Sequence, residues 1–273
     1  MKAQFIDKIL SSPWNIDKLR GRNILSQIIG TLLRSERPAE DVCGDPLPVM
    51  QILGDVAIIP LCGVVQMAVP DWVKRWGFNL TDANDIEQEL TRALADPNVR
   101  LIVFDVNSPG GSSLAGDKLF DIVEAANRHK PVFAFCGDGC DMASTAYEAV
   151  AACTAIMAGW YAEGVGCVGS YLAWLDDSQY WANLGIKFHV FRSGELKGIG
   201  EDALSQAQSD YLQQKVDQAG ARFRSAVTKY RTGISADDMH GQWFTGTEAA
   251  SRGFVAGNAR DLNAAIAKFR RMI

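Results

Sequence analysis

The chain has 273 residues, enough to bury a sizeable hydrophobic core without disulfides or a structural metal. Hydrophobic residues make up 48% and charged residues 22%, a balance typical of a globular protein and not of an extended disordered chain. The net charge of −5 argues against a nucleic-acid-binding protein, which usually carries a basic excess.

The sequence also bears on compartment and cofactors. The uncharged stretches 23–33 and 149–162 are too short for a transmembrane helix, and Asp7 and Lys8 interrupt the region where a secretory signal has its apolar core. The six cysteines include no Cys-x-x-Cys pair, so we expect buried free thiols in a reducing compartment and no zinc site. We therefore expect a cytoplasmic protein without a metal or a cofactor.

Residues 1–48 have a pattern of their own. Apolar residues recur at helical spacing within 5–10 and 24–33, and a Ser-Ser-Pro sequence at 11–13 separates these stretches. Pro13 is suited to the first turn of a helix, and the charged, proline-containing residues 34–48 are typical of a linker. The sequence thus predicts a helical prefix with a linker at 1–48 and one domain at 49–273.

From residue 51 onward, short apolar runs alternate with amphipathic stretches. We expect strands at 56–61, 101–106, 132–136 and 155–158, and helices at 83–96, 113–128, 144–153 and 202–231. A further strand is expected to end just before Ser193. Continuous apolar strands that alternate with helices predict an α/β fold with buried, mostly parallel strands.

The first candidate for chemistry is the Asn-Ser-Pro-Gly-Gly-Ser stretch at 107–112, between a predicted strand and a predicted helix. Two glycines allow the backbone to bend and to expose N–H groups that can hold an anion or a developing oxyanion. An ordinary strand-to-helix turn would have the same composition. The stretch is not a phosphate-binding loop, because the Gly-x-x-x-x-Gly-Lys pattern is absent.

Two more candidates are single side chains. Ser144 opens a predicted helix directly after a strand and a turn, where a nucleophile can be displayed, although a helix N-cap would place a serine there as well. Lys197 lies between Leu196 and Ile199, where burial would lower its pKa and favour a neutral base, although a solvated loop lysine is the simpler interpretation. The three histidines have no compelling serine and carboxylate partners, so a Ser–Lys pair is favoured over a Ser–His–Asp triad.

Five ordered motifs make the chain similar to the signal peptide peptidase A family of serine peptidases, which shares a fold with ClpP and the crotonases. They are Asp-Val-Asn-Ser-Pro-Gly-Gly-Ser at 105–112, Ala-Ser-Thr-Ala-Tyr at 143–147, Gly-Cys-Val-Gly at 166–169, Ser-Gly-Glu-Leu-Lys at 193–197 and Thr-Gly-Thr-Glu-Ala-Ala-Ser-Arg-Gly-Phe-Val at 245–255. The resemblance covers residues 52–258. It implies a ClpP/crotonase-like spiral of β-β-α units with largely parallel buried strands.

The resemblance implies a role for each matched residue. Ser144 would be the nucleophile and Lys197 the general base, with the backbone N–H of Gly110 or Gly111 in the oxyanion hole. Where the family has Gly-Gly after the serine, this chain has Thr145 and Ala146. Where the family has Gly-Ser-Ile-Gly, whose serine supports the lysine, this chain has Cys167, with Ser170 close by in sequence.

The resemblance also implies an assembly. In the family, the serine and the lysine of one site come from two tandem halves of a chain or from neighbouring subunits, and this chain has a single half. A homo-oligomer, ring-like and with Ser144 meeting Lys197 across an interface, is therefore expected.

The branch of the family follows from the missing membrane anchor. A single-unit chain with a helical prefix resembles the capsid-maturation proteases of tailed phages and prophages, which cleave scaffold and other head proteins inside the procapsid. The expected partners are scaffold or capsid polypeptides, and the expected location is the host cytoplasm or the procapsid. Three alternatives stay open: a housekeeping peptidase, a non-catalytic homologue in capsid assembly, and a crotonase-type acyl-CoA enzyme.

Overall fold

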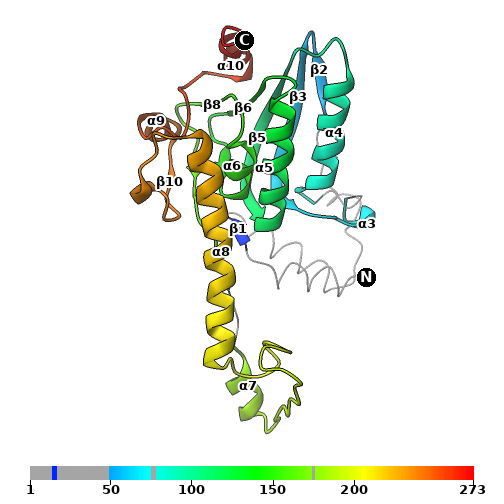
Figure 1. The fold of residues 1–273 in the computed structure, drawn as a ribbon, viewed down its shortest axis with the longest axis vertical. Helices are drawn as coiled ribbons and strands as arrows, with labels where there is room; N and C mark the ends of the chain where they lie inside the picture. The colour runs from blue at the N-terminus through cyan, green and yellow to red at the C-terminus, as the bar shows by residue number, and fades with distance from the viewer. Residues whose placement is uncertain (1–13, 17–48, 75–77, 174–175) are drawn as a thin grey trace.

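The apolar runs of the sequence form a mixed, mostly parallel sheet in the computed structural model, which describes residues 14–16, 49–74, 78–173 and 176–273 (Figure 1). The strands are β1 (Trp14–Ile16), β2 (Gln51–Leu53), β3 (Val56–Gln66), β4 (Leu80–Asp82), β5 (Leu101–Ser112), β6 (Val132–Cys136), β7 (Asp141–Ala143), β8 (Ala155–Ala158), β9 (Gly164–Gly166) and β10 (Trp243–Phe244). The longest path of neighbours is β10-β9-β7-β5-β3-β2, and β6 and β8 branch from β5. The expected α/β class with largely parallel buried strands is confirmed.

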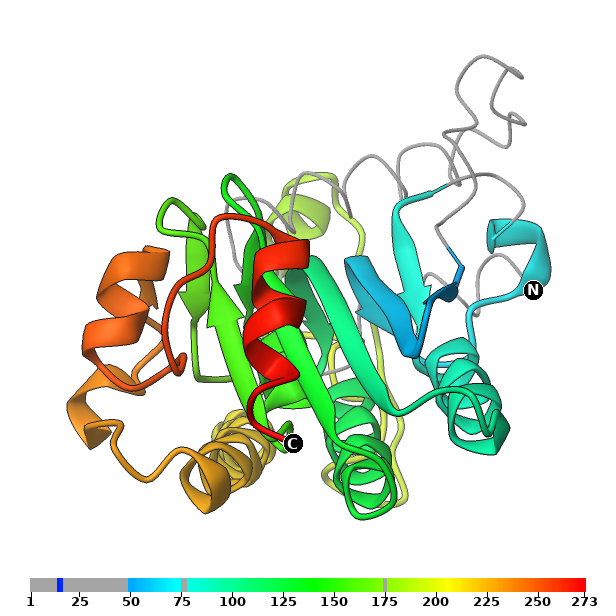
Figure 2. The ribbon, with the colours of Figure 1, turned by 90° about the horizontal axis from the view of Figure 1, so that it is seen from above.

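Helices cover the sheet on both faces. They are α3 (Asp71–Lys74), α4 (Ala83–Ala95), α5 (Ser113–Asn127), α6 (Thr145–Val150), α7 (Ser178–Asn183), α8 (Gln206–Tyr230), α9 (Gly246–Ser251) and α10 (Leu262–Phe269). Helices α4, α5 and α8 lie on one face of the sheet, and α10 lies on the other (Figure 2). None of the helices in these described ranges combines the length and the apolar character that crossing a membrane requires.

Strand β5 is buried on both faces, which explains its continuous apolar sequence. Ile102 and Phe104 belong to the core beneath α4, α5, α6 and α8, whereas Leu101 and Val103 belong to a second cluster beneath α10. In that second cluster the ring of Phe133 stacks on a phenylalanine of α10 at a centroid distance of 4.5 Å. Each fully buried side chain of this size contributes about 1.5–3 kcal/mol to the free energy of unfolding. Because β5 supplies such side chains to both clusters, it joins the two cores.

The two edges of β5 are occupied differently. Strand β3 runs parallel to one edge as far as Val65, which lies opposite Gly111. Three strands share the other edge in turn: β6 opposite 102–105, β7 opposite Ser108 and β1 opposite 110–112. Strands β6 and β7 are parallel to β5, and β1 is antiparallel to it.

Several expectations need correction. The strand predicted at 101–106 continues to Ser112, so the Gly-Gly stretch is strand and not turn. The strand expected to end just before Ser193 is absent, because residues 186–192 have irregular backbone. Residues 14–16 form a strand where Pro13 was expected to start a helix. The rest of the predicted prefix and linker lies outside the described residues.

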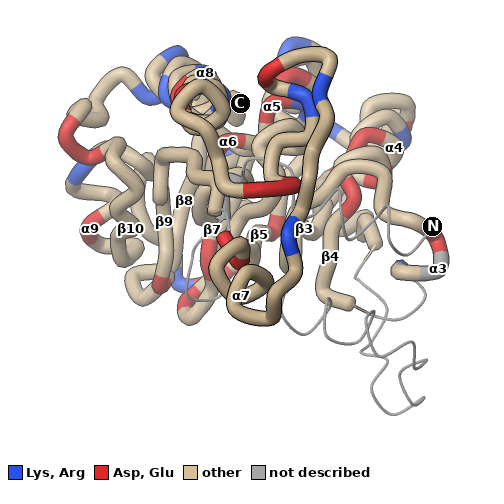
Figure 3. The backbone as a smooth tube through the Cα atoms, turned by 90° about the horizontal axis from the view of Figure 1, so that it is seen from below, with Lys and Arg blue, Asp and Glu red and all other residues tan. Residues whose placement is uncertain are grey.

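Charged residues of both signs are interspersed along α4, α5 and α8 (Figure 3). Some of them join α8 to α5: the Arg222 guanidinium lies 2.9 Å from the Asp117 carboxylate, and Glu124 pairs with Lys229 and accepts a hydrogen bond from Tyr230. Together with buried apolar side chains such as Phe223, these pairs hold the C-terminal half of α8 on the domain.

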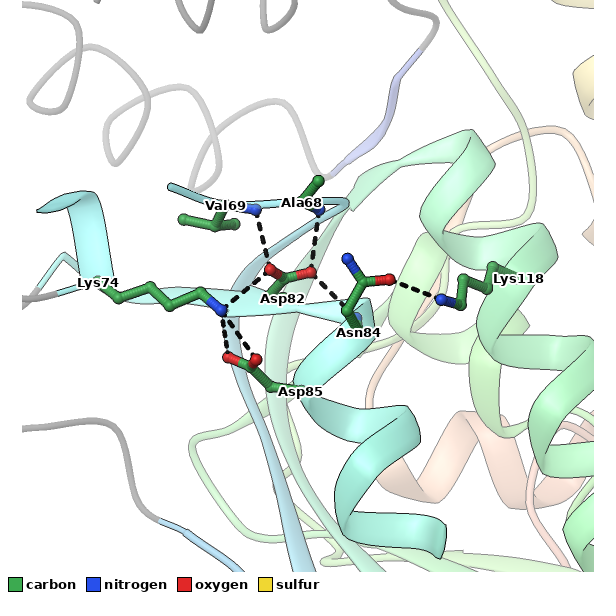
Figure 4. Close-up of polar contacts among 7 residues, drawn as sticks. All are labelled: Ala68, Val69, Lys74, Asp82, Asn84, Asp85 and Lys118. Atoms are coloured by element: carbon green, nitrogen blue, oxygen red, sulfur yellow. Dashed lines mark hydrogen bonds and ion pairs between the residues drawn. The ribbon is translucent and has the colours of Figure 1, made fainter. Parts of the chain in front are cut away.

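A buried carboxylate fixes the turn that follows β3 (Figure 4). Asp82 caps α4 by accepting the backbone N–H of Asn84 at 3.0 Å, and it also accepts those of Ala68 at 3.0 Å and Val69 at 2.9 Å. The Lys74 ammonium lies 3.1 Å from the same carboxylate and balances its charge. Because β3 ends beside Gly111, this network holds the strand that supports the Gly-Gly stretch.

Replacing Asp82 with alanine is expected to lower the free energy of unfolding by about 2–4 kcal/mol, because three backbone donors and a lysine lose their buried acceptor. Urea denaturation measures the change. The matched control is Asp85→Ala, which removes the other carboxylate bound by Lys74 but from a half-exposed side chain, and should cost at most about 1 kcal/mol. Equal effects of the two substitutions would contradict this account.

Candidate active site

Ser144 occupies a strained turn between β7 and α6. Its backbone has φ 57° and ψ −125°, a conformation that costs a non-glycine residue of order 1–3 kcal/mol and that clusters at functional sites. The turn is held at both ends, since the Ser144 N–H donates to the Gly166 carbonyl at 2.7 Å and its carbonyl accepts the Glu148 N–H at 2.9 Å. The strand, turn and helix thus fix where the hydroxyl lies.

The Ser144 side chain is buried and does not cap the helix. Its exposed fraction is 1%, and its hydroxyl has no hydrogen-bond partner among the described residues. The residue therefore stands at the N-cap position without making the N-cap hydrogen bond. An unpaired buried hydroxyl costs about 1–3 kcal/mol, so this arrangement favours a chemical role over a capping role.

Helix α6 is anchored by side chains that the sequence did not single out. Tyr147 is fully buried and donates its hydroxyl proton to the Phe254 carbonyl at 2.7 Å. Burial raises the pKa of Tyr147, which keeps the phenol protonated as a donor. Glu148 is buried against Gly116, where a Cβ would overlap its carboxylate. These contacts prevent the helix from shifting Ser144.

The Gly-Gly stretch continues β5 past a bulge. Gly110 has φ 104°, and a Cβ on Gly111 would overlap the Val65 carbonyl oxygen. The Ser108 hydroxyl donates to the Gly63 carbonyl at 2.6 Å and accepts the Gly110 N–H at 3.2 Å. The Gly110 N–H therefore already has a long hydrogen bond, which an oxyanion would have to displace.

The sheet brings this stretch and the serine together. Ser108 lies opposite Met142 in the parallel β5–β7 pair, so two residues further along each chain Gly110 is level with Ser144. Both lie at the same edge of β5, the edge that β3 does not occupy. A developing negative charge near Ser144 would thus face the backbone of Gly110 and Gly111.

The predicted lysine-supporting residues follow β9. Cys167 is half-buried at φ 52°, and its N–H donates to the Gln242 carbonyl at 2.8 Å. It comes directly after Gly166, whose carbonyl binds the Ser144 N–H. Ser170 has a buried hydroxyl that, like that of Ser144, has no hydrogen-bond partner in the part of the chain that is described.

Lys197 is not beside Ser144 in this chain. It is exposed, in the irregular segment between α7 and α8, and the Arg192 guanidinium holds its carbonyl at 2.8 Å. In residues 209–218 of α8 every side chain is at least partly exposed, and the helix packs on the domain from Ala219 onward. In the single chain Lys197 is thus the solvated loop lysine of the simpler interpretation, and not a buried base.

We call residues 176–218 the arm. Figure 1 shows α7 at the end of α8 that points away from the sheet. The 13 residues from the start of α8 to Ala219 span about 20 Å at a helical rise, which separates the segment with Lys197 from α6. The arm exposes several large apolar side chains: Tyr180, Leu184, Phe188, Phe191 and Leu196, of which Phe191 is 96% exposed. Large apolar side chains exposed along one segment favour an interaction surface there.

Thiols near the site are poor nucleophiles. Cys62 lies opposite Asn107 in the β3–β5 pair, and burial together with the Asp105 carboxylate raises its pKa to about 11. Burial also raises the pKa of Cys140, which precedes β7. A thiol reacts as the thiolate, so at neutral pH these groups are nearly inert and Ser144 is the better candidate.

The site as described is built from a serine hydroxyl, backbone donors and thiols. Among the residues placed by the structure, no three His, Cys, Asp or Glu side chains gather as ligands for a metal ion. His189 lies in the irregular backbone of the arm, where a strand ending just before Ser193 was expected.

A strained serine between a strand and a helix, beside a glycine-rich strand edge, is the arrangement of an acyl-transfer hydrolase. Residues 124–271 match the model of peptidase family S49, more than half of the chain, and the chain belongs to that family.

Two viral proteins are among the relatives. The chain is 28% identical over 228 residues to the head-tail preconnector protein GP5 of Enterobacteria phage P21, covering 80% of this chain and 42% of that protein. It is 26% identical over 213 residues to the capsid assembly protease C of Escherichia phage lambda, covering 75% and 46%. The chain thus spans less than half the length of these two relatives.

Among solved structures, a ClpP1 mutant from Listeria monocytogenes aligns with a TM-score of 0.46 at 13% identity, covering 76% of this chain and 93% of that one.

The thiol account is testable by alkylation. Iodoacetamide should modify Cys62 of the folded protein about 100-fold more slowly at pH 7.5 than it modifies an ordinary exposed thiol. The rate should rise about tenfold per pH unit from pH 7 to 9, because the thiolate fraction grows tenfold per unit below the raised pKa. Mass spectrometry of the digested protein measures it, with the urea-unfolded chain as control. A rate equal to that of the unfolded chain would contradict the raised pKa.

Proposed function

We propose that the chain is a serine endopeptidase with Ser144 as nucleophile and Lys197 as general base. The observation that carries the proposal is the buried Ser144 hydroxyl, held in a strained turn beside the backbone of Gly110 and Gly111. Membership of peptidase family S49 supports the reaction class.

The proposed reaction has two stages, acylation of Ser144 and hydrolysis of the acyl group. The neutral Lys197 amine takes the Ser144 proton as the hydroxyl oxygen attacks the peptide carbonyl, and the backbone donors of β5 stabilise the oxyanion. The lysine then protonates the leaving amine, which leaves an ester on Ser144. Water activated by the same amine hydrolyses the ester, releasing a carboxylic acid and restoring the serine hydroxyl.

The base is supplied by a neighbouring copy of the chain in this proposal. Within one chain the arm carries Lys197 away from α6, and the apolar side chains of the arm are exposed where a second copy would cover them. The unpaired hydroxyls of Ser144 and Ser170 would gain a partner from an incoming amine, which offsets their desolvation cost. Ser170 then takes the lysine-supporting role that Cys167, with its weak thiol donor and acceptor, performs less well.

The proposed substrates are scaffold or capsid polypeptides of a phage or prophage. Support comes from the two viral relatives, which are described as a head-tail preconnector protein and a capsid assembly protease. Cleavage within an assembling head suits a protease whose site is completed only when copies associate.

Casein digestion by the parent protein, Ser144→Ala, Lys197→Ala and an equimolar mixture of the two variants tests the shared site. Each variant alone should lose at least about 1,000-fold in kcat/KM, since each lacks one partner of the dyad. The mixture should regain a fraction of the parental activity, because one copy still has the serine and its neighbour the lysine. Lys187→Ala, which removes another arm lysine, is the matched control and should stay active.

The outcomes separate the claims. Full activity of Ser144→Ala would exclude Ser144 as the nucleophile. Two inactive variants whose mixture stays inactive, after subunit exchange is verified by mass spectrometry, would contradict the site shared between copies.

A further inference from the structure

The edge of β5 at the Gly-Gly stretch is occupied by the chain itself. Strand β1 pairs antiparallel with it, with Ile16 opposite Gly110, Asn15 opposite Gly111 and Trp14 opposite Ser112. These backbone positions lie on the edge that also receives β7, since β3 fills the opposite edge up to Gly111. Three residues from the N-terminal part of the chain thus lie along the strand that flanks Ser144.

The position of β1 follows from where β7 stops. Strand β7 lies between β5 and β9, and its last residue is Ala143. At Ser144 the chain turns away into α6. From the level of Gly110 onward, β7 therefore no longer pairs with this edge of β5. Strand β1 begins to occupy that place with Ile16, level with the nucleophile.

We propose that residues 14–16 occupy this edge of β5, residues 110–112, as a tethered inhibitor, in the place that an extended peptide substrate takes. The inference rests on the proposed function and adds its regulation. Strand addition supplies backbone hydrogen bonds to any extended peptide, so a segment of the same chain competes for the same donors and acceptors.

The register gives the direction of the bound peptide. Because β1 is antiparallel to β5, its N-terminal residue Trp14 lies opposite Ser112 and its C-terminal residue Ile16 lies opposite Gly110, nearest Ser144. A substrate in this register has three residues paired with β5. The carbonyl of the third residue, at the position of Ile16, is the one that lies nearest Ser144. The tethered segment therefore occupies the positions along β5 that the residues before the scissile bond would take.

A tethered strand competes strongly even when each contact is weak. Because β1 and β5 belong to one chain, their pairing is intramolecular, and linked partners reach effective concentrations of up to order millimolar. An external peptide that binds in the micromolar range therefore meets an edge that is mostly filled. The apparent affinity of the peptide equals its intrinsic affinity multiplied by the fraction of copies in which the edge is free. Releasing β1 should therefore raise peptide affinity by about tenfold or more.

Peptide binding to full-length proteins tests the inference. All carry Ser144→Ala, so that the probe is not cleaved, and one also carries Asn15→Pro with Ile16→Pro. Successive N–H groups of a strand point to opposite sides, so this pair removes an N–H that faces β5 whichever residue supplies it. The matched control carries Ala39→Pro with Glu40→Pro, two prolines elsewhere in the N-terminal 48 residues. The probe is a fluorescein-labelled Ser-Ser-Pro-Trp-Asn-Ile peptide, the sequence of residues 11–16, followed by anisotropy.

The expected result is binding at least about tenfold tighter to the Asn15→Pro/Ile16→Pro protein than to the other two, which should bind equally. The same peptide with proline in place of its asparagine and isoleucine should bind that protein at least about tenfold more weakly. Equal binding of the probe by all three proteins would overturn the inference, and so would equal gains in both proline variants.

Casein cleavage with Ser144 intact separates this inference from the proposed function. The Asn15→Pro/Ile16→Pro enzyme should cleave casein several-fold faster than the parent at low casein concentration. If no protein cleaves casein, the proposed function fails, yet the binding difference still decides whether β1 fills the edge. If the parent cleaves casein through Ser144 and the proline pair changes neither binding nor rate, the function stands and the tethered strand is refuted.

Discussion

The close approach of β5 to β3 at Gly111 is the contact on which the rest of the site depends. A side chain at this position would overlap the Val65 carbonyl, so only glycine lets the two strands stay paired beyond the bulge. Because they stay paired, β5 presents a long second edge, which receives β6, β7 and β1 in turn. Asp82 supports the same region from the other side by tying down the turn that follows β3.

Much of the fold could be predicted from local pattern. Strands β6 and β8 begin and end where their apolar runs do, and α4 and α5 match the expected helices to within one residue. These elements depend on burial of a face that the sequence itself displays. The α/β class followed from their alternation.

The predictions that failed concern residues whose structure depends on contacts distant in sequence. Residues 107–112 looked like a turn because Pro109, Gly110 and Gly111 punctuate them, and only pairing with β3 makes them strand. Ser144 and the Gly-Gly stretch were identified as candidates, but the positive φ of Ser144, which accompanies the hydrogen bond from its N–H to the Gly166 carbonyl, cannot be inferred from residue type. The apolar neighbours of Lys197 suggested partial burial, but in the arm Leu196 and Lys197 are exposed and Ile199 is half-buried. Asp82 carried a usable signal, as an aspartate directly before a predicted helix.

The arm has a consequence for how the molecule responds to its own concentration. If one copy supplies the nucleophile and another the base, turnover is second order in protein at high dilution and first order once copies are assembled. Such a molecule is inactive through dilution alone while its concentration is low. It becomes active where many copies are confined together, so that the volume enclosing it acts as its regulator.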